Sequence, residues 1–337
     1  MTAAVIFGCA GPTLMESEYT FFRDVDPLGF ILFQRNCESP DQVRSLVRDL
    51  RGSVGRPEAP VLIDQEGGRV ARLRPPTWRA APAPGRIAAI ATRDRTLALE
   101  AARLNASLMG RELAGLGITV DCAPVLDLHV SGAHAGVVGD RALGSDPDLV
   151  SALGRAICDG LLAGGVDPVI KHMPGHGRAL VDSHHDLPRV EASLDELRQT
   201  DFVPFRRLAD MRWGMTAHVV YAAIDSERPA TTSSKVIAEI IRGEIGFDGL
   251  LVTDDLSMRA LQGDLADRTR RALSAGCDLA LHCTGRLDEM REVADAAGPV
   301  SDATARRVAR LPKPSTPPPA MDVAAAEAHL NALMAVA

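Results

Sequence analysis

The chain has 337 residues, of which 46% are hydrophobic and 24% charged, as is typical of a globular protein with one large domain or two ordinary ones. A formal net charge of −7 and the lack of a long basic run argue against a nucleic-acid surface. No run reaches the roughly 20 apolar residues of a membrane span, and the first residues, MTAAVIFGCAG, do not resemble a signal peptide.

The six cysteines are scattered along the chain and form no CxxC pair. They are Cys9, Cys37, Cys122, Cys158, Cys277 and Cys283. Several lie in or beside apolar runs, so we expect reduced, mostly buried thiols and not a disulfide framework. This pattern favours a cytoplasmic protein.

Eight short apolar runs predict β-strands, at residues 4–8, 29–33, 60–63, 119–122, 168–170, 214–218, 250–253 and 278–282. Helical patterns lie between most of them, at residues 41–50, 95–116, 149–163, 234–245 and 266–275. Such alternation indicates a parallel sheet covered by helices. Eight units predict an α/β protein folded as a single-domain (β/α)8 TIM-type barrel. A doubly wound open sheet is the main alternative, although the first strand leads into CAGP and not into a GxGxxG turn.

The end of the chain differs in composition from the rest. We expect residues 1–311 to form the barrel and to carry the catalytic site. Residues 312–337 contain the run KPSTPPPA and then an alanine-rich helical pattern over residues 323–336. They predict a Pro-rich surface linker and a C-terminal helical tail.

The densest group of titratable residues lies in residues 171–188, KHMPGHGRALVDSHHDLP. It holds four of the nine histidines in the chain, His172, His176, His184 and His185. Proline and glycine at Pro174, Gly175 and Gly177 disfavour a helix, so we expect a loop that begins after the strand at residues 168–170. In α/β enzymes, catalytic residues commonly lie on polar loops that follow buried strands.

Other polar residues also follow predicted strands. They are Asp64 to Arg72 after the third strand, Asp127 after the fourth, Arg141 in a later loop, Lys171 and His172 after the fifth, and Asp254 and Asp255 after the seventh. Because the carboxyl ends of barrel strands meet at one rim, a single site explains all of these positions.

Asp254 is the first acid after an apolar run, where a carboxylate suits a nucleophile or an acceptor for substrate hydroxyls. The alternative is an N-cap for the following turn, a role that Asp255 could take instead. Asp182 and His184 lie two residues apart, and a carboxylate beside an imidazole raises its pKa and fixes its tautomer for proton transfer. His185 and Asp186 are adjacent alternatives for that pair.

Asp64, Arg72, Arg141, Lys171 and His172 have the paired donors and acceptors that a polyhydroxylated ligand needs. An ion-pair ring that stabilises the barrel mouth is the alternative. His172 and His176 have the spacing of a helical metal-ligand pair, but Pro174 and Gly175 break that helix, so we expect no metal. No phosphate-binding GxxxxGK[ST] loop occurs in the sequence.

At these residues the sequence resembles glycoside hydrolase family 3, and within it the bacterial β-N-acetylhexosaminidases (N-acetylglucosaminidases) of peptidoglycan recycling. The matching pieces, in the family's order, are GFILFQRN, IDQEGGRVARL, APVLDL, GDRALGSDP, KHMPGHG with DSHHDLP, and TDDLSM. They span residues 29–258, which is most of the predicted barrel. KHxPGHG followed by DSH is highly specific, and TDDLSM downstream makes chance agreement improbable.

The resemblance implies a retaining mechanism with Asp254 as nucleophile and His184, paired with Asp182, as acid/base. It implies sugar contacts from Asp64, Arg72, Arg141, Lys171 and His172. It also implies hydrolysis of terminal β-linked N-acetylglucosamine from anhydro-muropeptides in the cytoplasm, without cofactor or metal. We expect a small-molecule sugar or muropeptide as partner, and no nucleic acid or membrane. The oligomeric state stays open.

One departure from the family lies beside this loop. Many relatives have an acid and a threonine after PGHG, where this chain has Arg178 and Ala179. The Asp182-Ser183-His184 triplet is retained. The alternatives for function are a β-glucosidase or a phosphorolytic enzyme with the same dyad, and a non-catalytic sugar-binding barrel.

Overall fold

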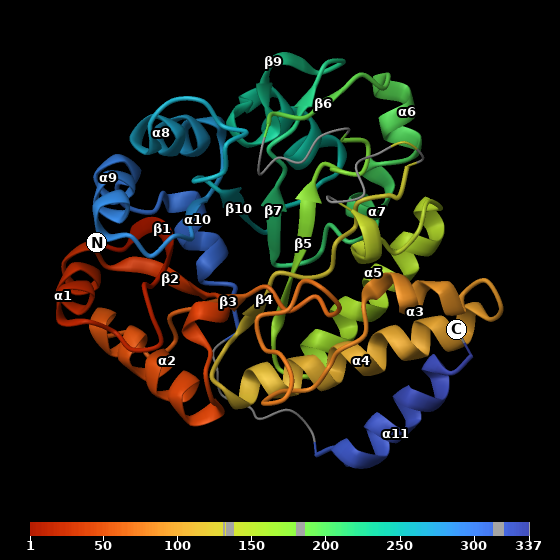
Figure 1. Cartoon of the computed structure of the whole chain (residues 1–337). Helices are drawn as coiled ribbons and strands as arrows, with labels where there is room; N and C mark the ends of the chain where they lie inside the picture. The colour runs from red at the N-terminus through yellow and green to blue at the C-terminus, as the bar shows by residue number, and fades with distance from the viewer. Residues whose placement is uncertain (131, 133–137, 180–185, 313–319, 337) are drawn as a thin grey trace.

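Eight parallel strands close into a barrel at the centre of the molecule (Figure 1). The computed structural model describes residues 1–130, 132, 138–179, 186–312 and 320–336. Around the barrel the strand order is β1-β11-β10-β7-β5-β4-β3-β2, with every neighbouring pair parallel. The strands are β1 (Ala3–Gly8), β2 (Pro27–Leu32), β3 (Val61–Ile63), β4 (Val120–Asp121), β5 (Asp167–Met173), β7 (Trp213–Thr216), β10 (Leu250–Asp255) and β11 (Leu279–His282). All eight predicted strands are therefore confirmed, and the open sheet is excluded.

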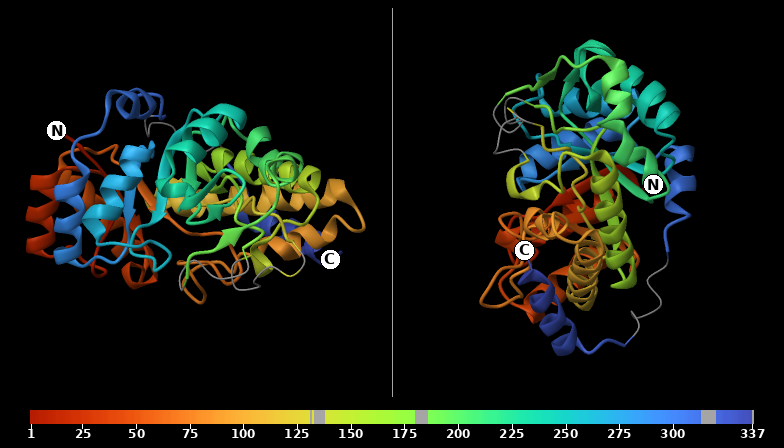
Figure 2. Two further views of the ribbon diagram at one scale, coloured as in Figure 1. Left: turned by 90° about the horizontal axis from the view of Figure 1, so that it is seen from above. Right: turned by 90° about the vertical axis from the view of Figure 1, so that its right-hand side faces the viewer.

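Helices surround the barrel in all three views (Figures 1 and 2). They are α1 (Glu16–Val25), α2 (Pro40–Val54), α3 (Pro84–Ile90), α4 (Arg95–Gly115), α5 (Pro147–Ala163), α6 (Leu194–Gln199), α7 (Phe202–Arg207), a π-helix (Val236–Glu244), α8 (Leu265–Ala275), α9 (Leu287–Ala297) and α10 (Asp302–Val308). Local signals set several boundaries. Ser39 caps α2 ahead of Pro40, and Gly55 ends it with a φ of 63°. The five helices expected between strands are all present.

The strands bury both faces, which explains why they read as continuous apolar runs. Ile6 of β1, Leu62 of β3 and Trp213 of β7 belong to one cluster, which takes side chains from all eight strands and fills the barrel. Val5 and Phe7, the neighbours of Ile6, pack instead into the larger cluster between strands and helices. A parallel sheet covered by helices requires this two-sided burial.

The expectation that a loop begins at Lys171 was wrong. Strand β5 continues to Met173, so Lys171 and His172 lie in the strand. Leu126 N donates to Lys171 O at 2.7 Å, and Met173 pairs with Thr216 of β7. These pairings with distant segments extend the strand to Met173, just before Pro174. The local sequence of residues 171–173 did not indicate a strand. The extension points strand side chains into the barrel mouth.

A small second sheet, in the order β6-β8-β9, lies outside the barrel and was not predicted. Its strands are β6 (Arg189–Val190), β8 (Val220–Tyr221) and β9 (Asp225–Pro229). The chain leaves β7, forms the β8–β9 hairpin and then enters a short 3-10 helix, η3 (Ala230–Thr232). The hairpin therefore returns Thr231 to the end of β7.

The predicted C-terminal helix is present as α11 (Val323–Met334), which lies beside α4 (Figures 1 and 2). Leu330 and Leu333 are buried, and His329 Nε2 lies 2.7 Å from Glu100 Oε1. Residues 313–319 of the predicted linker lie outside the described residues. The division into a barrel and a linker with tail stays a prediction, but the tail helix itself is packed against the barrel's helices.

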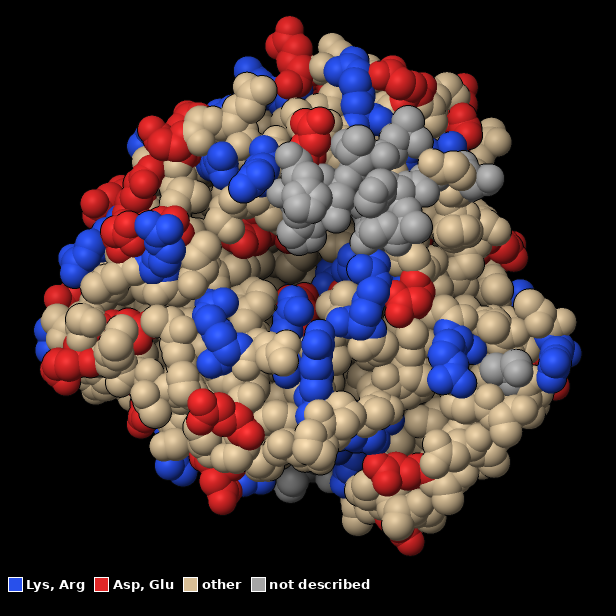
Figure 3. Space-filling view, viewed as in Figure 1, with Lys and Arg blue, Asp and Glu red and all other residues tan. Residues whose placement is uncertain are grey.

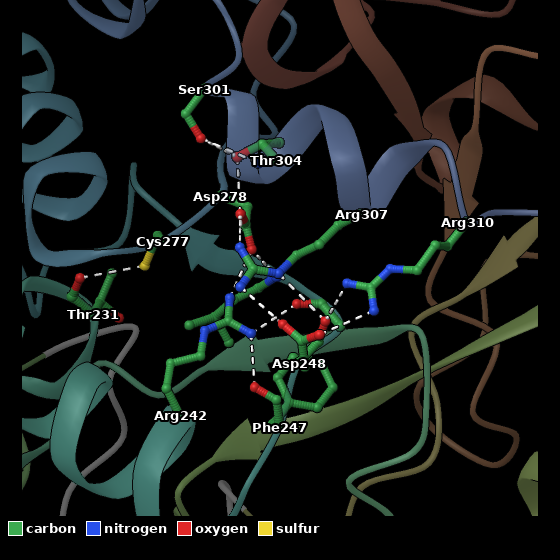
Figure 4. A network of polar contacts seen from close by, with 12 residues as sticks. Thr231, Arg242, Phe247, Asp248, Cys277, Asp278, Ser301, Thr304, Arg307 and Arg310 are labelled. Carbon is green, nitrogen blue, oxygen red and sulfur yellow. Dashed lines mark hydrogen bonds and ion pairs between the residues drawn. The ribbon is translucent and has the colours of Figure 1, made fainter.

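An ion-pair network closes the amino end of the barrel around Asp278 (Figure 4). Asp278 Oδ1 accepts hydrogen bonds from Thr304 Oγ1 at 2.8 Å and Arg307 Nη1 at 2.9 Å. Its Oδ2 accepts from Arg242 Nη2 at 2.7 Å and Leu251 N at 2.9 Å. Both arginine side chains are largely buried. One carboxylate thus joins β10, β11, α10 and the π-helix.

We expect Asp278→Ala to lower the free energy of unfolding by about 3–5 kcal/mol, because it leaves the largely buried guanidinium of Arg242 without its counter-charge and Arg307 with only the exposed carboxylate of Asp248. Any catalytic turnover per folded molecule should not change, since the network lies at the end opposite the strands' carboxyl ends. Urea denaturation measures the loss. Asp288→Ala is the control, because its ion pair with Arg286 is exposed and such pairs contribute little to stability. Equal losses in the two variants would contradict the assignment.

Candidate active site

A cavity of about 290 Å³ opens at the carboxyl ends of the strands. Its walls include all six described residues among those predicted for the site, namely Asp64, Arg72, Arg141, Lys171, His172 and Asp254, together with Glu66, His176 and Asp255. Figure 3 shows the hollow near the middle of this face, with lysine and arginine side chains gathered along its edge. The residues predicted from separate strand ends therefore share one cavity.

The buried amine of Lys171 joins two carboxylates on one side of the cavity. Lys171 Nζ lies 2.9 Å from Asp64 Oδ1 and 2.7 Å from Glu66 Oε1. Arg72 Nη2 contacts Asp64 Oδ2 at 2.9 Å, and Arg141 forms two 2.7 Å contacts with the two oxygens of Glu66. These contacts hold the donors and acceptors of the two acids and three bases in fixed positions relative to one another.

These acids stay ionised although they are buried. Burial alone would raise the pKa of Asp64, but Lys171 and Arg72 outweigh it and hold that pKa below its usual range. Burial likewise opposes ionisation of Glu66, and Lys171 with Arg141 lowers its pKa to about 2. The same partners raise the pKa of Lys171 against the effect of burial. A fixed charged array of this kind suits vicinal hydroxyls, which both donate and accept.

Asp127 orients the histidines on β5 and in the turn that follows it. Its Oδ2 lies 2.7 Å from His172 Nδ1, and its Oδ1 accepts from the backbone N–H groups of His172 and His176 at 3.1 and 2.7 Å. Burial opposes its charge, but the two histidines lower its pKa to about 2. The ionised carboxylate accepts the Nδ1 proton of His172, which leaves Nε2 available to the cavity.

Asp254 is held at the end of β10 with its carboxylate in the cavity wall. Its Oδ1 accepts the backbone N–H of Asp255 at 2.8 Å. Burial raises the pKa of Asp254, but its surroundings outweigh burial, with His172 the largest contributor beside this hydrogen bond and Lys171, and the pKa is lowered. Asp255 instead binds Ser257, accepting from its N–H at 3.0 Å and its hydroxyl at 2.6 Å. The capping role thus falls to Asp255, and Asp254 is an ionised carboxylate facing the cavity.

The predicted acid/base pair, Asp182 and His184, lies outside the described residues, as does the alternative His185. Its assignment stays a prediction. Before this segment, Arg178 contacts Asp201 Oδ2 and Glu196 Oε1, both at 2.7 Å. The arginine that departs from the family pattern is therefore bound to α6 and the residue that precedes α7.

Three polar residues in or next to the site were given no role of their own from the sequence, although Glu66 and Asp127 lie in segments predicted to be at the site. Glu66 and Asp127 stand in the DQEGG and APVLDL motifs, and His218 is the last residue of the strand predicted at residues 214–218. Their positions at strand ends were the available signal, but the sequence did not show which buried charges they contact. Within the described ranges, no group of three or more His, Cys, Asp or Glu is placed to hold a metal ion.

Comparison with known proteins now identifies the family. Residues 24–311 match the N-terminal domain of glycosyl hydrolase family 3. The chain belongs to glycoside hydrolase family 3. A family 3 relative, the beta-hexosaminidase of Alkalilimnicola ehrlichii, is 42% identical over 283 residues, which cover 83% of this chain and 80% of the relative. The beta-hexosaminidase of Pseudomonas aeruginosa is 40% identical over 289 residues, or 85% and 84% of the two chains.

Solved structures of the family agree with this assignment. NagZ from Neisseria gonorrhoeae, in complex with N-trifluoroacetyl-D-glucosamine, superposes with a TM-score of 0.89 at 33% identity, covering 99% of this chain and 98% of that one. The chain is therefore a glycoside hydrolase with the TIM-type barrel of family 3. In the described part of the chain, no helix has the length and apolar character needed to cross a membrane.

Proposed function

We propose that this family 3 enzyme is a retaining β-N-acetylhexosaminidase, which removes terminal β-linked N-acetylglucosamine from cell-wall fragments of the anhydro-muropeptide type. We place this reaction in the cytoplasm, as a step of peptidoglycan recycling. Two facts support the proposal: the 40–42% identical relatives named beta-hexosaminidase, and the N-acylglucosamine analogue bound to the similar neisserial protein. The single observation that carries the chemistry is the ionised Asp254 carboxylate in the cavity of the Lys171 array.

The proposed reaction has two steps. Asp254 attacks the anomeric carbon and forms a glycosyl-enzyme ester, while protonated His184 gives its proton to the leaving glycosidic oxygen. Neutral His184 then takes a proton from water as the water breaks the ester, which restores Asp254. Asp182 fixes the tautomer of His184 and stabilises its charged form. Asp64, Arg72, Arg141, Lys171 and His172 bind the hydroxyls of the sugar.

Paired chromogenic substrates test the activity. We expect release of nitrophenol from p-nitrophenyl N-acetyl-β-glucosaminide and at most weak release from the corresponding β-glucoside. Adding inorganic phosphate should not raise the rate or give a sugar phosphate, which separates hydrolysis from phosphorolysis. Preference for the glucoside, or formation of a sugar phosphate, would overturn the proposed subclass. Turnover of neither substrate would overturn the proposed specificity.

Substitution of His184 tests its proton-transfer role. We expect His184→Ala to lower kcat/KM for a natural disaccharide by about 10²–10⁴-fold, because the poor leaving group needs the proton. For an aryl glycoside with a good leaving group, kcat/KM should fall much less, since it reports the first step. His185→Ala is the matched neighbour and should behave as wild type. Equal losses on the two substrates would exclude the acid role.

A further inference from the structure

His218 is buried behind the cavity and does not line it. The residue follows β7 and has a partner on each ring nitrogen. Nε2 lies 3.0 Å from the backbone oxygen of Asp255, and Nδ1 lies 2.7 Å from the hydroxyl of Thr231. The imidazole therefore bridges the residue next to Asp254 and the short helix that follows the β8–β9 hairpin.

The chemistry of these partners fixes the tautomer of His218. A carbonyl oxygen only accepts, so Nε2 carries the proton and donates it to Asp255. The bare Nδ1 then accepts from Thr231 Oγ1 at 2.7 Å, a shorter contact than the 3.1 Å from the same hydroxyl to the backbone oxygen of Ala217. Thr231 Oγ1 lies 2.8 Å from Thr216 Oγ1 and can accept from that hydroxyl in turn. Burial lowers the pKa of His218, as a neutral ring requires. One hydrogen-bond chain thus runs from Thr216 through Thr231 and His218 to Asp255.

Asp255 links His218 to Asp254, because the contacts that hold Asp255 also fix the direction of its N–H. Its carbonyl is held by His218, and its carboxylate is held by Ser257 and by the backbone N–H of Cys283 at 3.3 Å. With both groups anchored, its own N–H is aimed at Asp254 Oδ1 at 2.8 Å. The carboxylate of Asp254 is therefore oriented by the N–H of Asp255, a residue whose carbonyl is held by His218 after β7 and whose side chain is held by Ser257 and by Cys283 after β11.

We propose that His218 is a positioning residue for the nucleophile: through the carbonyl of Asp255 it sets the peptide N–H that orients the Asp254 carboxylate toward the anomeric carbon. This inference rests on the nucleophile role of Asp254 in the proposed function. It also explains the small outer sheet, because the β8–β9 hairpin delivers Thr231 to Nδ1. A reacting group misplaced by about 1 Å costs on the order of 10²-fold in rate.

Substitution of His218 gives the primary test. We expect His218→Leu to lower kcat on p-nitrophenyl N-acetyl-β-glucosaminide by about 10²-fold per folded molecule, because it removes the donor that orients Asp255. The Kd of N-acetylglucosamine should stay within about threefold, since His218 does not line the cavity. His218→Gln keeps an N–H donor and should recover most of the loss. Unchanged kcat in His218→Leu, or equal defects in the Leu and Gln variants, would overturn the proposal.

Removal of the Thr231 hydroxyl tests its hydrogen bond to Nδ1 of His218. Thr231→Val should lower kcat by about tenfold, and it should add nothing in the His218→Leu background, since linked residues are not additive. Thr269→Val is the matched control, because Thr269 is equally buried and its hydroxyl donates to Leu265 O at 2.7 Å on α8. Equal kcat losses in the two threonine variants would exclude the specific role of Thr231.

A covalent-labelling assay tests the nucleophile role of Asp254 separately from the positioning role of His218. A slow fluorinated N-acetylglucosaminide should leave a glycosyl group on Asp254 that peptide mass spectrometry detects, and His218→Leu should acquire it about 10²-fold more slowly. Labelling at another residue in the wild-type protein would overturn the nucleophile assignment, and the inference with it. Labelling of Asp254 at equal rates in both proteins would overturn only the role of His218.

Discussion

Asp254→Asn is expected to reduce kcat by roughly 10⁴-fold or more, because an uncharged amide is not an effective nucleophile at the anomeric carbon. The fold should persist, since asparagine has the same shape and its Oδ1 can still accept the N–H of Asp255. Circular dichroism and the Kd of N-acetylglucosamine establish that the variant is folded and binds sugar. Near wild-type turnover would exclude Asp254 as the nucleophile.

Azide rescue distinguishes a lost nucleophile from a distorted site. In Asp254→Ala the space of the carboxylate is free, so azide should enter from the same side of the sugar and restore cleavage of the p-nitrophenyl substrate. The product should be the α-glycosyl azide, whose configuration NMR determines. Asp64→Ala is the matched control, because it also removes a carboxylate from the cavity but should not be rescued. A β-azide product would place the missing nucleophile elsewhere.

The position of the site could be predicted because it follows from the barrel. The eight apolar runs are strands buried on both faces, and the carboxyl ends of parallel strands meet at one rim. Asp64, Lys171 and Asp254 come from three different strands, yet the order of strands and helices alone was enough to bring them together. Their contacts with one another could not be predicted, since these depend on side-chain directions.

The missed residues are those whose roles depend on tertiary contacts. Glu66 stands beside two glycines in a loop-like motif, and the sequence did not show that its carboxylate lies between Lys171 and Arg141. His218 is a single imidazole at the last position of a predicted strand, and a buried histidine of this kind has no distinctive local pattern. Strand β5 runs past its expected end because β7 and the segment after β4 pair with it. Local preferences at Pro174 and Gly175 could not reveal those partners.

Lys171→Met is expected to cost about 3–5 kcal/mol of unfolding free energy, since it leaves Asp64 and Glu66 without the cation they share. The ion pair is buried, with the Lys171 and Glu66 side chains 3% and 1% exposed, so its loss leaves charge out of reach of solvent. Hydrolysis should also fall, as the sugar loses a donor and the two acids repel each other. Urea denaturation and kcat/KM measure the two effects. Lys235→Met, which removes only one bond to the backbone oxygen of Ile224, should cost less than about 1.5 kcal/mol.

The pH dependence of the stability lost in Lys171→Met tests whether that loss is electrostatic. Glu66 has a pKa of about 2 in the folded protein, and Asp64 is also depressed, against unfolded values of about 4.3 and 3.9. A depressed carboxyl contributes stability above its unfolded pKa and loses that contribution as the pH falls through its folded pKa. The difference between wild type and Lys171→Met should therefore be largest near pH 7 and shrink as the pH falls below about 4.3. A difference that stays constant down to pH 3 would instead indicate lost packing of the lysine side chain, and Lys171→Arg, which keeps the charge, should then be no more stable than Lys171→Met.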